Sequence, residues 1–196
     1  MIELSTPRLL LRTWQPADLR GFAELNGDPQ VMRHFPSVMS RAQSDAMARR
    51  MQAHFVTHGF GYWVLERHAQ PGLLGVLGLQ QVGFAAAFSP AVEIGWRIQR
   101  AHWRQGYALE AAQAVLAYAF STLQLAEVLA FTVPANLPSQ ALMQRLGLAR
   151  NPAEDFAHPL LPVGHPLRRH WLYRLGREQW LGRQPAGVAE QVLSGD

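Results

Sequence analysis

The chain has 196 residues, of which 48% are hydrophobic and 16% charged, a composition that favours one folded domain and excludes a disordered chain. It has no cysteine, which excludes disulfides and thiolate chemistry, and all 18 basic residues are arginine, which excludes a P-loop lysine or a lysine Schiff base. The net charge of +4 is spread over both halves of the chain and predicts no nucleic-acid-binding face. No apolar run is long enough to cross a membrane and no secretory leader is visible, so we expect a cytoplasmic protein.

The pattern of apolar residues and turn formers predicts the secondary structure. In chain order we expect a strand at 8–13, helices at 16–27 and 40–59, strands at 60–66, 73–82 and 91–99, a helix at 106–123, a strand at 127–133, a helix at 136–147 and a strand at 168–175. The helix at 40–59 begins with a capping box formed by Ser40 and Gln43. Pro71-Gly72 is typical of a turn. We expect a single domain over residues 1–183, followed by a poorly ordered tail at 184–196.

The strand at 91–99 and the turn that follows it are the most informative part of the sequence. In the strand, Glu93, Gly95 and Arg97 alternate with apolar residues and therefore share one face. The turn opens a long helix, and a turn in this position exposes backbone N–H groups that favour anions. Gly106 and Ala108 are small enough to let a phosphate approach, while nearby arginines add positive charge. The alternative is a solvated loop in which the glycine only makes a turn.

Two sequence blocks resemble a known family. The segment Val92–Trp96 followed by Trp103–Ala111 resembles the acetyl-CoA motif of GNAT N-acetyltransferases, and it is most similar to the RimJ/RimL-like branch, which acetylates protein N-termini and diverse small amines. The second block, Asn136–Ser139 followed by Leu142–Leu148, resembles the family's Asn-x-x-Ser helix. The resemblance covers roughly residues 4–181.

The resemblance implies an α+β fold in layers, with a mixed, mostly antiparallel twisted sheet of six to seven strands, about four helices, and two central strands splayed to hold CoA. It implies acetyl-CoA as co-substrate, no metal, and an amine acceptor that is a small molecule or a protein N-terminus. The sequence itself lacks the interleaved aromatic and basic residues that nucleic-acid stacking needs, and it has no membrane-spanning run, so we expect neither a nucleic-acid nor a membrane partner. The resemblance leaves open the length of the acyl group and the choice between a monomer and a homodimer. The residues that it assigns to the cofactor are Ile98, Arg100, Trp103, Arg104, Gln105, Gly106, Tyr107, Ala108 and Asn136.

Two residues are candidates for catalysis. The resemblance places Glu93 beside the thioester, where it would accept a proton from the amine, and the alternative is an ion pair with Arg97 on the same face. Backbone N–H groups near Ile98 would then stabilise the oxyanion. Ser139 would stabilise or protonate the departing thiolate, and the alternative is that it caps the helix.

The sequence departs from the family pattern at three positions, the first of which is Trp103, at the start of the pyrophosphate turn, where glutamine or arginine is usual and where the branch often has tryptophan. Arg104 stands where glycine is common, and Met143 stands where many members have a tyrosine that protonates the thiolate. A methionine donates no proton, so the acid must be another group, a water, or absent. An acyl-CoA-binding or sensor protein without turnover is therefore the alternative function.

Three histidines lie near the end of the chain, at His158, His165 and His170. Their spacing allows a metal site, but no carboxylate–histidine pattern supports one. Two of them precede a proline, which favours turns instead.

Overall fold

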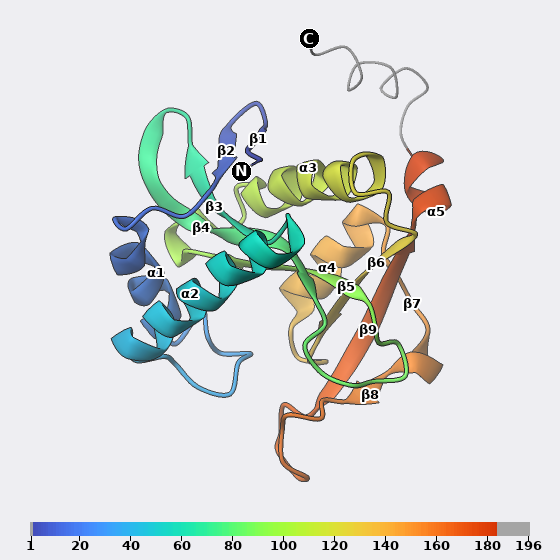
Figure 1. The fold of residues 1–196 in the computed structure, drawn as a ribbon. Helices are drawn as coiled ribbons and strands as arrows, with labels where there is room; N and C mark the ends of the chain where they lie inside the picture. Colours follow the sequence, from blue (N-terminus) through green and yellow to red (C-terminus); the bar gives the residue numbers. More distant parts are fainter. Residues whose placement is uncertain (1, 184–196) are drawn as a thin grey trace.

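The structure is a computed structural model and describes residues 2–183, so that the expected tail at 184–196 lies outside the described residues. One nine-stranded sheet runs through the described part of the chain, in the order β1-β2-β3-β4-β5-β6-β9-β7, with β8 paired to β9 (Figure 1). The strands are β1 (Leu4–Ser5), β2 (Leu9–Arg12), β3 (Tyr62–Arg67), β4 (Gln70–Gln81), β5 (Val92–Ile98), β6 (Glu127–Thr132), β7 (Ala149–Arg150), β8 (Phe156–Ala157) and β9 (Arg169–Gly176). The helices are α1 (Asp18–Gly27), α2 (Arg41–His58), α3 (Tyr107–Ser121), α4 (Leu137–Leu146) and α5 (Arg177–Leu181), with short 3-10 turns η1 (Arg100–His102) and η2 (Pro152–Glu154).

The expected fold class is confirmed, and each predicted helix and strand is present with ends shifted by up to three residues. Helix α2 begins with the expected capping box, in which Ser40 and Gln43 bond each other's backbone. The sheet has more strands than the six to seven expected, because β1, β7 and β8 are two-residue strands. The predicted turn at Pro71-Gly72 is wrong: these residues lie within β4, and the chain reverses at residues 68–69.

The centre of the sheet opens between β5 and β6. These strands are parallel and pair at a single position, with Glu93 opposite Leu129, whereas the other strand pairs in residues 2–183 are antiparallel. Because the pairing stops there, the strands separate toward their carboxyl ends. The expected splay of two central strands is therefore present, and it leaves a gap that connects the two faces of the sheet.

Helices cover both faces of the sheet (Figure 1). Helices α1 and α2 lie on one face, where Phe22 and Ala48 pack with Val76 of β4. The opposite face carries α3, α4 and α5 and the larger apolar core, in which Leu77 and Ile94 belong to the same cluster as the buried side of α3. Burial of these apolar side chains is the main source of stability, at roughly 25 cal/mol per Å² of apolar surface removed from water. None of the helices in the described chain is long and apolar enough to cross a membrane.

Candidate active site

The turn between β5 and α3 has an unusual backbone. Trp103 anchors it, because the indole Nε1 donates a 2.8 Å hydrogen bond to the carbonyl oxygen of Ile98. Arg104 and Gly106 both adopt left-handed conformations, with φ of +59° and +83°. Arg104 thus occupies a conformation that glycine adopts without strain, which gives a physical reason for the glycine that the family commonly has there. Left-handed residues just before a helix turn successive N–H groups toward one concave surface, which suits an anion.

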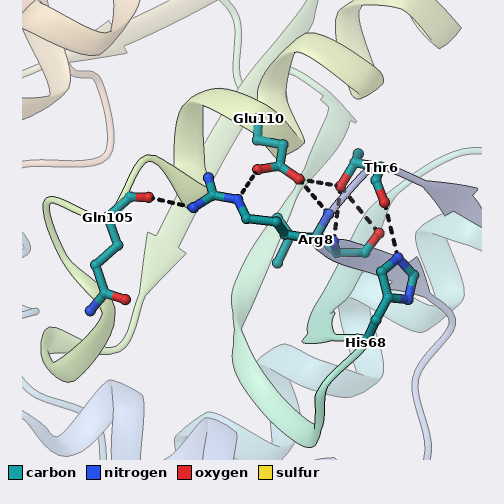
Figure 2. Close-up of polar contacts among 6 residues, drawn as sticks. Thr6, Arg8, His68, Gln105 and Glu110 are labelled. Atoms are coloured by element: carbon teal, nitrogen blue, oxygen red, sulfur yellow. Dashed lines mark hydrogen bonds and ion pairs between the residues drawn. The ribbon is translucent and has the colours of Figure 1, made fainter.

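Arg8 of the segment before β2 braces this turn (Figure 2). Its Nη1 donates to the carbonyl oxygen of Gln105 at 2.9 Å, and its Nε donates to Glu110 Oε2 at 2.6 Å. The guanidinium also lies over the Tyr107 ring, 4.6 Å from its centroid. Thr6 completes the cluster with a 2.7 Å hydrogen bond to Glu110. Sequence reasoning missed this role, because the contact spans about a hundred residues and Arg8 carries no local pattern.

A cavity of about 870 Å³ lies beside the turn, within the usual range for small-molecule sites. Most of the predicted cofactor residues line it, namely Ile98, Trp103, Arg104, Gly106, Tyr107, Ala108 and Asn136. Arg33 and Arg145 line it as well, and neither was predicted. The structure does not bring Arg100 and Gln105 into this wall. Arg100 approaches the Asp28 carboxylate at 3.5 Å, and Gln105 bonds the Ala101 carbonyl oxygen.

A second cavity of about 510 Å³ adjoins the first, and the two share wall residues that include Trp96 and Ser139. Its lining comes from both faces of the sheet: Tyr62 and Glu93 from the α1–α2 side, and Met143 from α4 on the other side. The space therefore passes through the gap between β5 and β6, and it joins the turn at the start of α3 to the region beneath α2.

Glu93 is the one carboxylate among the described residues that line either cavity. Burial raises its pKa to about 7, although a 2.6 Å hydrogen bond from Gln80 Nε2 acts in the opposite direction. The alternative ion pair with Arg97 is not formed among residues 2–183, since Arg97 bonds Asn26 instead. Gly95 lies between Glu93 and Arg97 in the strand, and a side chain there would overlap the Tyr62 hydroxyl. Burial raises the pKa of Tyr62 as well. Glu93 thus titrates near neutral pH beside an open space, as a general base should.

The start of α4 places Asn136 and Ser139 in both cavities. Asn136 caps the helix, because its Oδ1 accepts from the Ser139 backbone N–H at 3.4 Å while its Nδ2 donates to Thr132 Oγ1 at 2.8 Å. The alternative role of Ser139 as the cap is therefore wrong, which leaves its hydroxyl available to the cavities. Met143 is 3% exposed and lines the second cavity, so the position where many family members have a tyrosine holds an apolar side chain.

Two of the three histidines near the chain end, His158 and His170, belong to an aromatic cluster. His158 and His170 lie 5.0 Å apart between ring centroids and pack with Phe131 and Phe156. Burial lowers the pKa of His170 to about 4, so its ring is neutral at pH 7. His165 forms a local turn, as expected, with Arg168 N–H donating to its carbonyl oxygen. Residues 2–183 contain no group of three or more His, Cys, Asp or Glu side chains arranged to hold a metal.

Comparisons with known proteins agree with this geometry. Residues 8–149 match the family model described as "Acetyltransferase (GNAT) domain". The uncharacterized N-acetyltransferase YnaD of Bacillus subtilis is 29% identical over 185 residues, which cover 91% of this chain and 99% of YnaD. Among solved structures, a GNAT-family acetyltransferase from Bacillus anthracis has a TM-score of 0.74 at 24% identity, covering 90% of this chain and 99% of its own. Spermidine N-acetyltransferase from Vibrio cholerae, solved with CoA and spermine, has a TM-score of 0.70 at 18% identity, covering 88% and 98% of the two chains. At these identities the solved structures show a shared fold, while the family match spans most of the chain, and the protein belongs to the GNAT family of acetyltransferases.

Proposed function

We propose that this acetyltransferase moves the acetyl group of acetyl-CoA to a primary amine, on a small molecule or a protein N-terminus, as the RimJ/RimL-like branch does. The observation that carries the proposal is Glu93, a half-buried carboxylate with a pKa of about 7 at the point where β5 and β6 part. An alkyl ammonium has a pKa near 10 and must lose a proton before its nitrogen can attack. A carboxylate that titrates near 7 accepts that proton, directly or through a water, more readily than an ordinary glutamate does.

The larger cavity fits acetyl-CoA. The N-terminus of α3 supplies N–H groups and a partial positive charge for a pyrophosphate, and Gly106 keeps a side chain out of their way. Arg33, Arg104 and Arg145 add positive charge to the walls. When bound, acetyl-CoA supplies the acetyl group as an activated thioester. The gap between β5 and β6 then gives an amine on the α1–α2 side a path to the acetyl carbon.

Ser139 is the group that we assign to the sulfur of the leaving thiolate. Its hydroxyl is free of the capping role, and the residue lines both cavities. Met143, one helical turn further along α4, has no proton to give. We therefore assign the side-chain assistance to a hydrogen bond from Ser139.

The proposal is tested by mixing the purified full chain with acetyl-CoA and a panel of amines and N-terminal peptides. We expect amine-dependent release of the CoA thiol, with an acetylated product of the corresponding mass. Tight binding of acetyl-CoA without turnover on any member of the panel would contradict the proposal and indicate an acyl-CoA-binding or sensor protein.

We expect Ser139→Ala to lower kcat by about tenfold, which corresponds to about 1.4 kcal/mol, while KM for acetyl-CoA stays within a few-fold. The effect is modest because a free thiol has a pKa near 8.5, so a CoA thiolate leaves without much assistance. Steady-state kinetics against Ser121→Ala, whose hydroxyl bonds Ala117 at the far end of α3, provide the control. A loss of cofactor binding with unchanged kcat would assign Ser139 to binding instead.

A further inference from the structure

Among the residues that the structure describes, Arg97 of β5 is a buried cation without an acidic partner. It is 9% exposed and lines both cavities. Its Nη1 donates a hydrogen bond to Asn26 Oδ1 and lies 3.7 Å from Met47 Sδ, and its guanidinium carbon is 4.3 Å from the centroid of the Phe35 ring. Its Nε is buried with no hydrogen-bond partner, and no carboxylate within residues 2–183 forms an ion pair with it.

The other strongly buried arginine shows how this chain normally compensates such a charge. Arg12 is 5% exposed and forms ion pairs with both Asp18 and Glu66, at 2.7 and 2.8 Å. Arg97 has instead an amide, a thioether and an aromatic ring, all neutral. Burying a charge is unfavourable unless it is paired and hydrogen-bonded. Burial accordingly lowers the pKa of Arg97, to about 10. The folded protein therefore keeps an unneutralised positive charge at the wall of a cavity.

A buried polar pair holds this charge in place. Asn26 of α1 and Ser44 of α2 are both 0% exposed, and Asn26 Nδ2 donates to Ser44 Oγ at 2.8 Å. This bond fixes the Asn26 amide with its oxygen toward Arg97. The helices α1 and α2 thus present a fixed acceptor to one edge of the guanidinium. Arg97 lines both cavities, so an anion bound there would supply the negative charge that the guanidinium lacks.

We propose that Arg97 is an anion-binding subsite for the acceptor, and that the acceptor is an amine that also carries a carboxylate on an apolar body. This inference rests on the proposed function. Glu93 and Arg97 rise from the same face of β5, and four residues of strand separate their Cα atoms by about 13 Å. An amine toward Glu93 and a carboxylate toward Arg97 fit the two ends of that span.

The remainder of the smaller cavity supports the apolar body. Its walls are mainly apolar or aromatic, and they include Met47, Met51, Phe131, Leu160 and Leu167. A polyamine would require several carboxylates, whereas the described residues that line this cavity include one, Glu93. The described walls of this cavity therefore lack the negative charge that would bind a polycation.

Binding is tested without turnover, using probes that lack an amine. On the full chain saturated with CoA, we expect calorimetry to show that 4-methylbenzoate binds at least tenfold more tightly than neutral 4-methylbenzamide. Arg97→Met should abolish this difference, and Arg20→Met, at an exposed arginine of α1 that lines neither cavity, should preserve it. Arg97→Gln, which removes the charge and keeps a polar side chain, is the second variant. Thermal unfolding verifies that each variant is folded.

Two results would overturn the inference. One is wild-type protein that binds the acid no better than the amide, or binds neither. The other is an Arg97→Met variant that loses CoA affinity while it keeps the acid preference, which would assign Arg97 to a cofactor phosphate, since it lines that cavity too.

Turnover separates this inference from the proposed function. The substrates 4-(aminomethyl)benzoate and 4-(aminomethyl)benzamide carry the same aminomethyl group and differ at the far side of the ring. We expect kcat/KM to be at least tenfold higher for the acid, and this ratio to fall close to one in Arg97→Met. Equal acetylation of both by the wild-type protein would overturn the anion subsite and leave the acetyltransferase proposal standing. If neither the pair nor any other amine is acetylated, the proposed function fails, while the benzoate binding result still decides the role of Arg97.

Discussion

Gly106→Glu is expected to weaken CoA binding by at least about 100-fold, or about 3 kcal/mol. Gly106 is the N-cap of α3 and lines the larger cavity, so a carboxylate there would occupy the place of a phosphate and compete for the same N–H groups. An acidic side chain at a helix N-terminus is favourable in the absence of a ligand. The electrostatic loss should therefore appear in CoA affinity, measured by calorimetry, rather than in folding.

Backbone strain must be separated from this effect, because Gly106 has a φ of +83°. Gly59→Glu is the matched control: Gly59 has a φ of +76°, nothing lies within 4 Å of an added Cβ, and it lines neither cavity. Gly106→Ala isolates the Cβ, which would lie 3.2 Å from Arg8 Nη2 and can be accommodated by a shift of that side chain. Unchanged CoA affinity in a folded Gly106→Glu variant would contradict the placement of the pyrophosphate.

The parts of the fold that were predictable are those specified by residues close in sequence. The capping box of Ser40 and Gln43 and the alternation along β5 are local patterns, and both are present. The two-residue strands depend on partners far along the chain: Leu4 pairs with Leu11, while Ala149 pairs with Arg174. Segments this short carry no period of their own, and only the neighbouring strand makes them part of the sheet.

In the candidate active site, too, the features specified by residues close in sequence were predictable and those that depend on distant residues were not. The turn at 103–108 could be located because small residues and a helix start occur together there. The partners of the charged residues could not, because each comes from another element. Arg97 shares a face with Glu93, yet the strand spacing separates them and Asn26 of α1 supplies the nearer acceptor. Arg100 likewise has a partner from a distant part of the sequence, because its guanidinium approaches Asp28 in the segment after α1.

Glu93→Gln has a consequence for stability that is independent of activity. Because the folded pKa of about 7 exceeds the ordinary 4.5, the native protein retains a proton between these values that the unfolded chain has released. The cost of ionising Glu93 therefore grows as pH rises from 4.5 to 7 and is complete above 7, where it amounts to about 3 kcal/mol. We expect Glu93→Gln, which can still accept the bond from Gln80, to raise the free energy of unfolding by up to that amount at pH 8 and little at pH 4.5. Denaturant titration at the two pH values measures this difference.

We expect Glu93→Gln to lower activity even though it raises stability, and we expect this loss of activity to be the largest for any substitution in the site. At pH 7 we expect kcat to fall by about 100-fold or more, since general-base assistance is typically worth 10²–10⁴-fold. Wild-type kcat should rise with pH, with an apparent pKa near 7. Three histidines also line the smaller cavity, namely His34, His158 and His170, and burial lowers the pKa of each. Their titration therefore falls below that of Glu93.

The deficit should shrink as pH approaches 10, because the amine then loses its proton without help. Glu127→Gln on β6, whose carboxylate pairs with Arg174 and lines neither cavity, is the control and should retain the wild-type pH profile. A Glu93→Gln defect of the same size at every pH would contradict the role of general base. It would make Glu93 a structural partner of Gln80 instead, joined to it by the 2.6 Å hydrogen bond between β4 and β5.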